Sequence, residues 1–201
     1  MQDFINKLGE LTELHDKAVK TIALAEAYNP KRKAYLGLYN ELRNALFHVM
    51  EMIKTRGDEA KYDNEFRAAK SHFKRAGTDA CELLCLNCIE YISDLLRQYD
   101  EDILIAVPGY YTEIRPKAIE IKQNIAEIKL NKDSAKEDTF ENLFNQAEKL
   151  IGYVKCIDEY VPDIIEIQKK RRKGKRNERL FQIVMAIAIA LGFFVLGRYL
   201  S

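Results

Sequence analysis

The sequence has little proline and glycine, and it lacks the motifs of common nucleotide, metal and nucleophile sites. Only 4 prolines and 9 glycines occur among 201 residues, of which 47% are hydrophobic and 31% charged. This composition excludes a disordered or collagen-like chain and fits one folded domain with an appendage. There is no Gly-rich phosphate loop, no HExxH, no nucleophile elbow and no Rossmann fingerprint, so we expect no cofactor and no bound metal.

Net charge is also nearly absent, but the charges are unevenly distributed. The formal charge is +1, while residues 169–201 carry 9 Lys/Arg and a single acid, Glu178. The other 168 residues therefore carry a net charge of −7. An acidic body with a basic end is not the pattern of a general nucleic-acid coat protein, whose positive charge would be spread over the fold. No apolar stretch follows Met1, which argues against a secretory signal peptide.

A long hydrophobic run lies near the end of the sequence. Residues 180–197 contain one polar side chain, Gln182, and no charge, and the span 180–200 matches the roughly 20 residues that cross a bilayer core. The 8 basic residues of 169–179 directly precede it, and such clusters stay on the cytoplasmic side. We therefore predict a transmembrane helix at 180–200, a basic juxtamembrane segment at 169–179 and a cytoplasmic domain at 1–168. The alternative is a buried helix of a soluble core.

Apolar residues recur every three or four positions along the body and predict helices almost everywhere. Pro108-Gly109 is a turn, Gly77 is a point at which a helix can bend, and residues 131–138 form a polar connector. No segment alternates with the period of a strand, so we predict an all-α fold, an antiparallel helical bundle. The apolar stripes run over 4–25, 35–53, 62–99, 114–128 and 140–157, and a last helix begins at Pro162.

Three of the 4 cysteines follow the pattern CxxxCxxC, at Cys81, Cys85 and Cys88. This spacing resembles the iron–sulfur motif of radical S-adenosylmethionine enzymes, in which it follows a strand of a β/α barrel. No strand is predicted here, and the three positions share one face of a helix. We therefore predict that these cysteines are core residues that pack as small hydrophobic side chains in a reducing compartment.

The most informative segment is Glu41-Leu-Arg43-Asn44-Ala-Leu-Phe-His48. An arginine and a histidine separated by four residues, with asparagine directly after the arginine, resemble the R-x4-H motif of the HEPN superfamily. The segment 69–79, which contains His72 and Arg75, is similar to a helix of small bacterial HEPN proteins. The resemblance covers roughly residues 1–130. It implies a helical bundle that usually dimerises and, in active members, an arginine–histidine pair that cuts RNA without metal.

The chemistry of these residues is consistent with that implication. Asn44 and His48 are four residues apart on one helix face, which we expect to point away from a core stripe through Leu42 and Leu46. His48 can transfer a proton near neutral pH, Arg43 can hold a phosphate, and Asn44 can fix the imidazole tautomer. Arg43 lies about 140° from His48 around the helix, so it either curls round or acts with the histidine of a second chain.

Local charge favours RNA as the ligand of this region. Residues 31–75 carry 11 Lys/Arg against 6 acids, although the body as a whole is acidic. We therefore take Arg43, Asn44 and His48 as candidate catalytic residues, and His72 and Arg75 as weaker candidates for contact with RNA. The alternative is a solvated helix face with an incidental histidine, because polar pairs four residues apart are common on helices.

Three functions follow from these observations. A short HEPN-like bundle with one transmembrane helix resembles the membrane accessory proteins encoded beside type VI-B CRISPR RNA-targeting nucleases. That resemblance implies bacterial antiviral defence at the inner membrane, with a homo-oligomer that acts on the lipid bilayer as a pore, and RNA or an RNA-guided nuclease complex as a further partner. The alternative function is a metal-independent endoribonuclease tethered to the membrane, and a third is an adaptor that tethers a partner.

Overall fold

The computed structural model describes residues 2–31, 33–99, 101–130 and 139–199, and every regular element in these ranges is helical. The predicted all-α class is therefore confirmed. The predicted connector 131–138 lies outside the described residues. The elements are α1 (Gln2–Ala27), α2 (Leu36–Lys54), α3 (Glu59–Tyr99), α4 (Glu101–Ala106), the π-helical turn η1 (Tyr110–Ile114), α5 (Arg115–Leu130) and α6 (Thr139–Tyr199).

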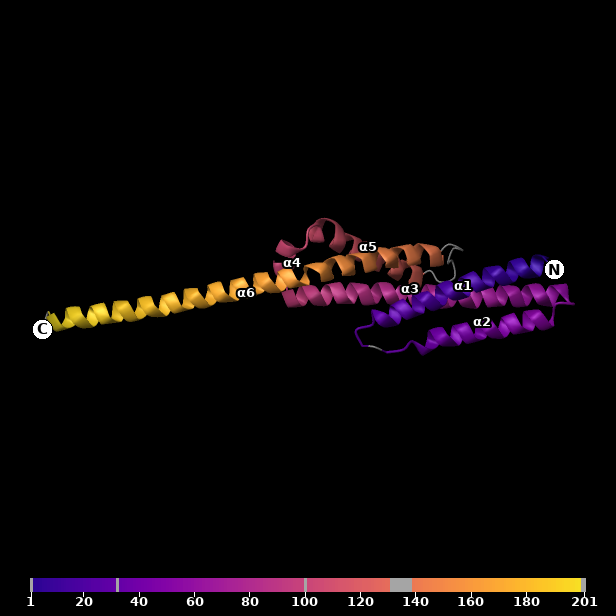
Figure 1. Ribbon diagram of the computed structural model, residues 1–201, viewed down its shortest axis with the longest axis horizontal. Coiled ribbons are helices and arrows are strands. Elements are labelled where there is room, and N and C mark those ends of the chain that lie inside the picture. The colour runs from indigo at the N-terminus through magenta and orange to yellow at the C-terminus, as the bar shows by residue number, and fades with distance from the viewer. Residues whose placement is uncertain (1, 32, 100, 131–138, 200–201) are drawn as a thin grey trace.

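Helix α3 is the axis of the molecule, because two hydrophobic cores form along it. It has 41 residues, which corresponds to a length of about 60 Å. Helices α1 and α2 lie along its first half, and α5 and the first part of α6 lie along its second half (Figure 1). The first core includes Leu11, Ile22, Leu42, Met52, Ala69 and Phe73, and the second includes Cys85, Ile92, Ile121, Leu143, Leu150 and Ile157.

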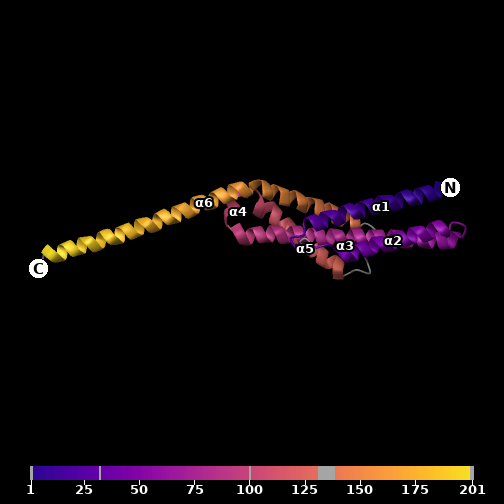
Figure 2. The same cartoon turned by 60° about the horizontal axis from the view of Figure 1, so that its bottom comes forward.

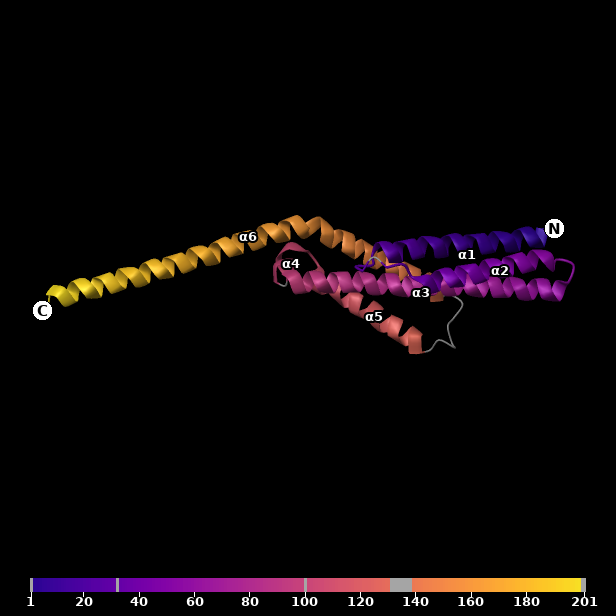
Figure 3. The same cartoon turned by 90° about the horizontal axis from the view of Figure 1, so that it is seen from below.

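The helices are not arranged as a simple antiparallel bundle. Helices α1, α3 and α6 run in one direction, while α2 and α5 run back (Figures 1 and 3). The antiparallel prediction is right for α2 and α5 against α3, but it is wrong for α1 and α6, which pack on α3 in the same direction. The reason for α6 is that α5 precedes it in the chain and runs back along α3, so that α6 can pack on α3 in the same direction as α3 itself.

The first turn of α6 docks at the middle of α3. The Phe140 ring is buried and lies directly over Gly77, where a Cβ would meet two ring carbons at 2.6 and 2.7 Å. Lys17 of α1 forms an ion pair with Glu141 and places its ammonium 4.5 Å from the centre of the Phe144 ring. Gly77 therefore lies within a continuous α3. It provides space for an aromatic ring and does not bend the helix.

The predicted role of the cysteines is confirmed. Cys81, Cys85 and Cys88 are fully buried in the second core, whereas Cys156 is half-buried. Burial raises the pKa of Cys81 and of Cys88 to about 12, and it also raises the pKa of Cys85. Because the thiolate is the reactive form of cysteine, these three thiols are inert in the folded protein.

This burial predicts a pattern of alkylation. At pH 8, iodoacetamide should modify Cys156 of the folded protein and leave Cys81, Cys85 and Cys88 unmodified, because their raised pKa values keep them protonated until the pH approaches those values. Mass spectrometry of tryptic peptides measures the modification at each site. In denaturant all four should react, and equal modification of all four without denaturant would contradict the buried placement.

The face of α2 that packs on the core differs in part from the predicted one. Its buried residues are Leu38, Leu42, Ala45 and Met52, whereas 47% of Leu46 is exposed. Of the predicted core stripe, which includes Leu42 and Leu46, Leu42 is buried but Leu46 is exposed, so the stripe is only partly right as a core face. Both faces of α2 carry apolar residues at helical spacing, so the pattern alone does not choose between them.

The last predicted helix does not begin at Pro162. That residue lies inside α6, which continues from Thr139 to Tyr199 and bends part of the way along (Figures 2 and 3). A proline inside a helix removes one backbone hydrogen bond and produces a bend rather than a necessary end. The basic segment 169–179 lies on the exposed stretch of α6 that extends beyond the other helices.

The prediction of a membrane span is corrected by the structure. Among the residues that it describes, no helix is long and apolar enough to cross a membrane. In the predicted transmembrane helix 180–200, the described side chains are those of Leu180–Ile187. Residues 188–200 of that prediction lie outside the described side chains. The predicted single-pass location in the inner membrane is corrected with it.

Candidate active site between α2 and α3

A repeated spacing places four polar side chains along the seam between α2 and α3. Glu41 and His48 are seven residues apart on α2, and Glu65 and His72 are seven residues apart on α3. Seven residues make nearly two helical turns, so each pair lies on one face of its helix. Because α2 and α3 run in opposite directions (Figure 1), the glutamate of each helix lies opposite the histidine of the other.

The contacts between these residues are short and reciprocal. Nδ1 of His48 lies 2.6 Å from Oε2 of Glu65, and Nδ1 of His72 lies 2.7 Å from Oε2 of Glu41. The two imidazole rings stack, with centroids 5.2 Å apart and planes 14° from parallel. Arg75 places a guanidinium nitrogen 3.6 Å from the same Oε2 of Glu41. We call Glu41, His48, Glu65 and His72 the histidine site.

The carboxylates assign the tautomer of each histidine. An ionised carboxylate accepts hydrogen bonds and has no proton to donate, so Nδ1 of His48 and of His72 donates in these contacts. Nε2 is then the nitrogen left to exchange a proton with another molecule. A histidine held in this way by a carboxylate is suited to general acid–base catalysis.

The histidine site lies at the edge of the first core and is open to solvent. The core residues Leu42, Ala45 and Phe73 lie on the same two helices and are buried. By contrast, 25% of the His48 side chain and 19% of the His72 side chain are exposed. Both imidazoles are therefore held by neighbours on the protein side while remaining accessible to a ligand.

The structure brings together three of the five candidate residues from the sequence. His48, His72 and Arg75 meet in or beside the histidine site. Arg43 is exposed, about 140° around α2 from His48, and Asn44 is half-buried. The face of His48, which we expect to point away from the core stripe through Leu42 and Leu46, lies against α3.

Sequence reasoning missed the two glutamates. Glu65, rather than Asn44, bonds to Nδ1 of His48, and Glu41 does the same for His72. The available signal was the spacing Glu-x6-His, which occurs at Glu41/His48 and again at Glu65/His72. On two antiparallel helices that pack in the matching register, this repeat pairs each acid with the other helix's histidine.

A second feature of α2 is an apolar stripe on its exposed side. Its side chains are between 44% and 73% exposed, and Arg43 lies in the middle of the stripe. The positions follow the spacing of three and four residues that is typical of a helix-pairing seam. We call this the outer stripe, formed by Leu36, Tyr39, Leu46, Met50 and Ile53.

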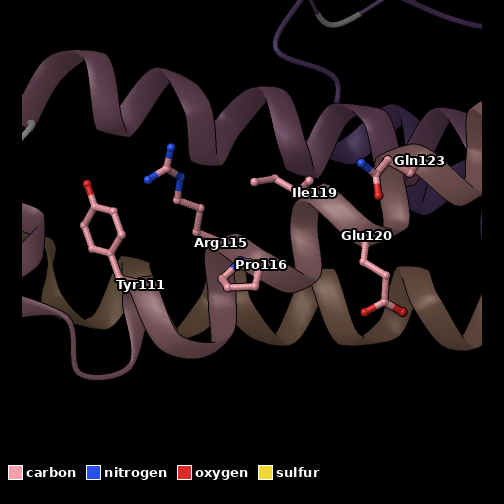
Figure 4. A pocket seen from close by; sticks show the side chains of 6 residues that line it. All are labelled: Tyr111, Arg115, Pro116, Ile119, Glu120 and Gln123. Carbon is pink, nitrogen blue, oxygen red and sulfur yellow. The ribbon is translucent and has the colours of Figure 1, made fainter.

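A hollow of about 410 Å³ lies on α5, away from the histidine site (Figure 4). The Arg115 guanidinium lies 5.1 Å from the centre of the Tyr111 ring, and Glu120 is the hollow's one acidic residue. The hollow is broad and open and contains no histidine or cysteine, so it lacks groups suited to proton transfer near neutral pH. Its lining is Tyr111, Arg115, Pro116, Ile119, Glu120 and Gln123.

Two further findings bear on the function. In the part of the chain that the structure describes, no three or more His, Cys, Asp or Glu side chains are placed to hold a metal ion. Comparison of the chain with protein-family models, with curated proteins and with solved structures gives no match. The function is therefore argued from the geometry and charge of the site.

Proposed function

We propose that the protein is a metal-independent endoribonuclease that uses His48 for proton transfer. The observation that carries this proposal is the His48 imidazole held by Glu65 at 2.6 Å on a partly open seam. Cleavage of RNA requires removal of a proton from a 2′-hydroxyl, and a positioned histidine near its working pH accelerates such steps by about 10²–10⁴-fold.

Cations close to the histidine site support a phosphate ligand. The Arg75 side chain is 53% exposed and lies one turn after His72, so its guanidinium can turn from Glu41 towards a phosphate. Residues 31–75, which include α2 and the start of α3, carry a net charge of +5. A basic region of this kind attracts the RNA backbone without reading its sequence.

The outer stripe supports a homodimer. Five exposed apolar side chains at a spacing of three and four residues form a seam that a second helix can cover. A second copy of α2 is the occupant that we infer, because a twofold axis places the same stripe against itself. The HEPN resemblance, which implies pairing, points in the same direction.

The membrane-effector hypothesis depended on a transmembrane helix at 180–200, and that prediction is corrected above. The endoribonuclease remains, and it depends on His48 and its neighbours rather than on the tail.

The test is cleavage of a fluorescent single-stranded RNA by the purified full-length chain in EDTA. We expect cleavage of RNA but not of DNA of the same sequence, because DNA lacks the 2′-hydroxyl. His48→Ala should lower the rate by about 100-fold or more, the range lost when a general base is removed.

His15→Ala provides the matched control for that experiment. His15 also contacts a carboxylate, Asp16 at 3.0 Å, but it lies on α1 outside the histidine site. Its replacement should leave the cleavage rate unchanged. Absence of RNA cleavage by the wild-type protein, or equal rates for wild type and His48→Ala, would refute the proposal.

A further inference from the structure

We propose that His72 is a second catalytic residue and that His48 and His72 divide the two proton transfers of RNA cleavage between them. This inference rests on the proposed ribonuclease function and adds the residue that completes the reaction. It assigns to one chain a site that needs no histidine from a second copy.

The near symmetry of the histidine site carries the inference. Each imidazole has its Nδ1 on a carboxylate of the opposite helix, at 2.6 Å for His48 and 2.7 Å for His72. Each side chain is partly exposed, and we assign the exchange of a proton with the substrate to Nε2 of each ring. A histidine that served only to pack would not need the same orientation and access as its catalytic neighbour.

The separation of the rings fits a single phosphodiester. The ring centroids are 5.2 Å apart. A catalytic nitrogen acts on an oxygen at about 2.6–3.2 Å, so two imidazoles at this separation can reach two oxygens bound to one phosphorus.

The reaction is then balanced without metal, water or redox change. One neutral imidazole takes the proton of the 2′-hydroxyl at Nε2, and the 2′-oxygen forms a bond to phosphorus. The bond between phosphorus and the 5′-oxygen breaks, and its electron pair goes to that oxygen. The other imidazole, protonated at Nε2, gives its proton to the 5′-oxygen. The products are a 2′,3′-cyclic phosphate and a 5′-hydroxyl, and proton exchange with solvent restores the pair.

The glutamates act as positioning residues in this scheme. Glu65 and Glu41 hold the two rings through Nδ1 and stabilise whichever imidazole carries a positive charge. Arg75, which is 3.6 Å from Glu41, is placed to hold the phosphate beside His72. The site thus contains two proton carriers, two orienting acids and one cation.

The test uses His48→Asn and His72→Asn. Asparagine Nδ2 can replace Nδ1 as the donor to the carboxylate, but asparagine has no counterpart of Nε2. Each variant is compared with wild type on RNA and on a mixture of the four nucleoside 3′-(4-nitrophenyl phosphates). Nitrophenolate leaves without being protonated, so these substrates need the base but not the acid. Thermal unfolding of each variant verifies its fold, and His15→Asn is the control.

We expect both variants to cleave RNA about 100-fold or more slowly than wild type. On the nitrophenyl substrates, the variant that lacks the acid should react at a rate within about tenfold of wild type, and this result identifies the acid. The rate of the variant that lacks the base should stay about 100-fold or more below wild type. Any other pattern overturns the division of roles. One such pattern is cleavage of RNA by His72→Asn at the wild-type rate. Wild-type protein that cleaves neither substrate refutes the ribonuclease itself, and this inference with it.

Discussion

Replacing Met50 with glutamate is expected to convert the proposed dimer to a monomer while RNA cleavage per chain stays within about threefold of wild type. Met50 lies in the outer stripe and is 59% exposed, so the substitution opens no cavity in the core. In a twofold dimer, each copy would bring a glutamate to the same seam, and burying those charges is unfavourable. His48 contacts α3 on another side of α2, so the monomer keeps its histidine site.

Sedimentation velocity measures the mass, and cleavage is measured on the same sample. Ile119→Glu is the matched control, because Ile119 is also exposed, at 48%, but lies on α5. This control should remain dimeric and active. If Met50→Glu were monomeric and inactive, Arg43 of a second copy would belong to the site, as the HEPN resemblance implies. A wild-type monomer would refute the homodimer.

Replacing Gly77 with alanine is expected to lower the free energy of unfolding by about 1–3 kcal/mol, the usual cost of overpacking a core. In an open helix the same change stabilises by up to about 1 kcal/mol, because alanine has the higher helix propensity. At Gly77 the new Cβ would meet Phe140 ring carbons at 2.6 and 2.7 Å. The ring is buried between α1, α3 and α6 and has little space to move.

Urea unfolding followed by circular dichroism measures the change, and two further variants give its cause. Gly152→Ala is the matched control on α6, because no atom lies within 4 Å of its added Cβ, and it should be neutral or stabilising. In a Phe140→Ala background, Gly77→Ala should also become neutral or stabilising. Destabilisation by Gly77→Ala that persists without the Phe140 ring would contradict the contact as the cause.

The helices and most of the core could be predicted from the sequence, because burial on every long helix except α2 follows one clear apolar stripe. The residues predicted for the helix after residue 139 are all buried, from Phe140 and Leu143 to Val154 and Ile157. The turn at Pro108-Gly109 is also confirmed, with Gly109 at φ 72°. At these positions the spacing of the apolar residues and the turn residues predict the same local structure.

The failures have identifiable physical reasons. Helix α2 has two apolar faces, and the one chosen from the sequence includes Leu46, which is exposed. The partners of His48 lie 17 and 24 residues further along the chain, on α3, so their pairing depends on how two helices pack. Asn44 lies one helical turn before His48 in the sequence, but Glu65 is the residue that contacts the ring.

Because Phe140 of α6 covers Gly77 of α3, the second core can close only after α6 has been synthesised. Helices α1, α2 and the first half of α3 leave the ribosome together and can form the first core at once. The second half of α3 is complete at Tyr99, but α6 begins only at Thr139. At a synthesis rate of about 5–20 residues per second, the face that carries Cys81, Cys85 and Cys88 remains exposed for several seconds before α6 covers it. These thiols, inert in the finished protein, are most open to oxidation and to non-native contacts in that interval.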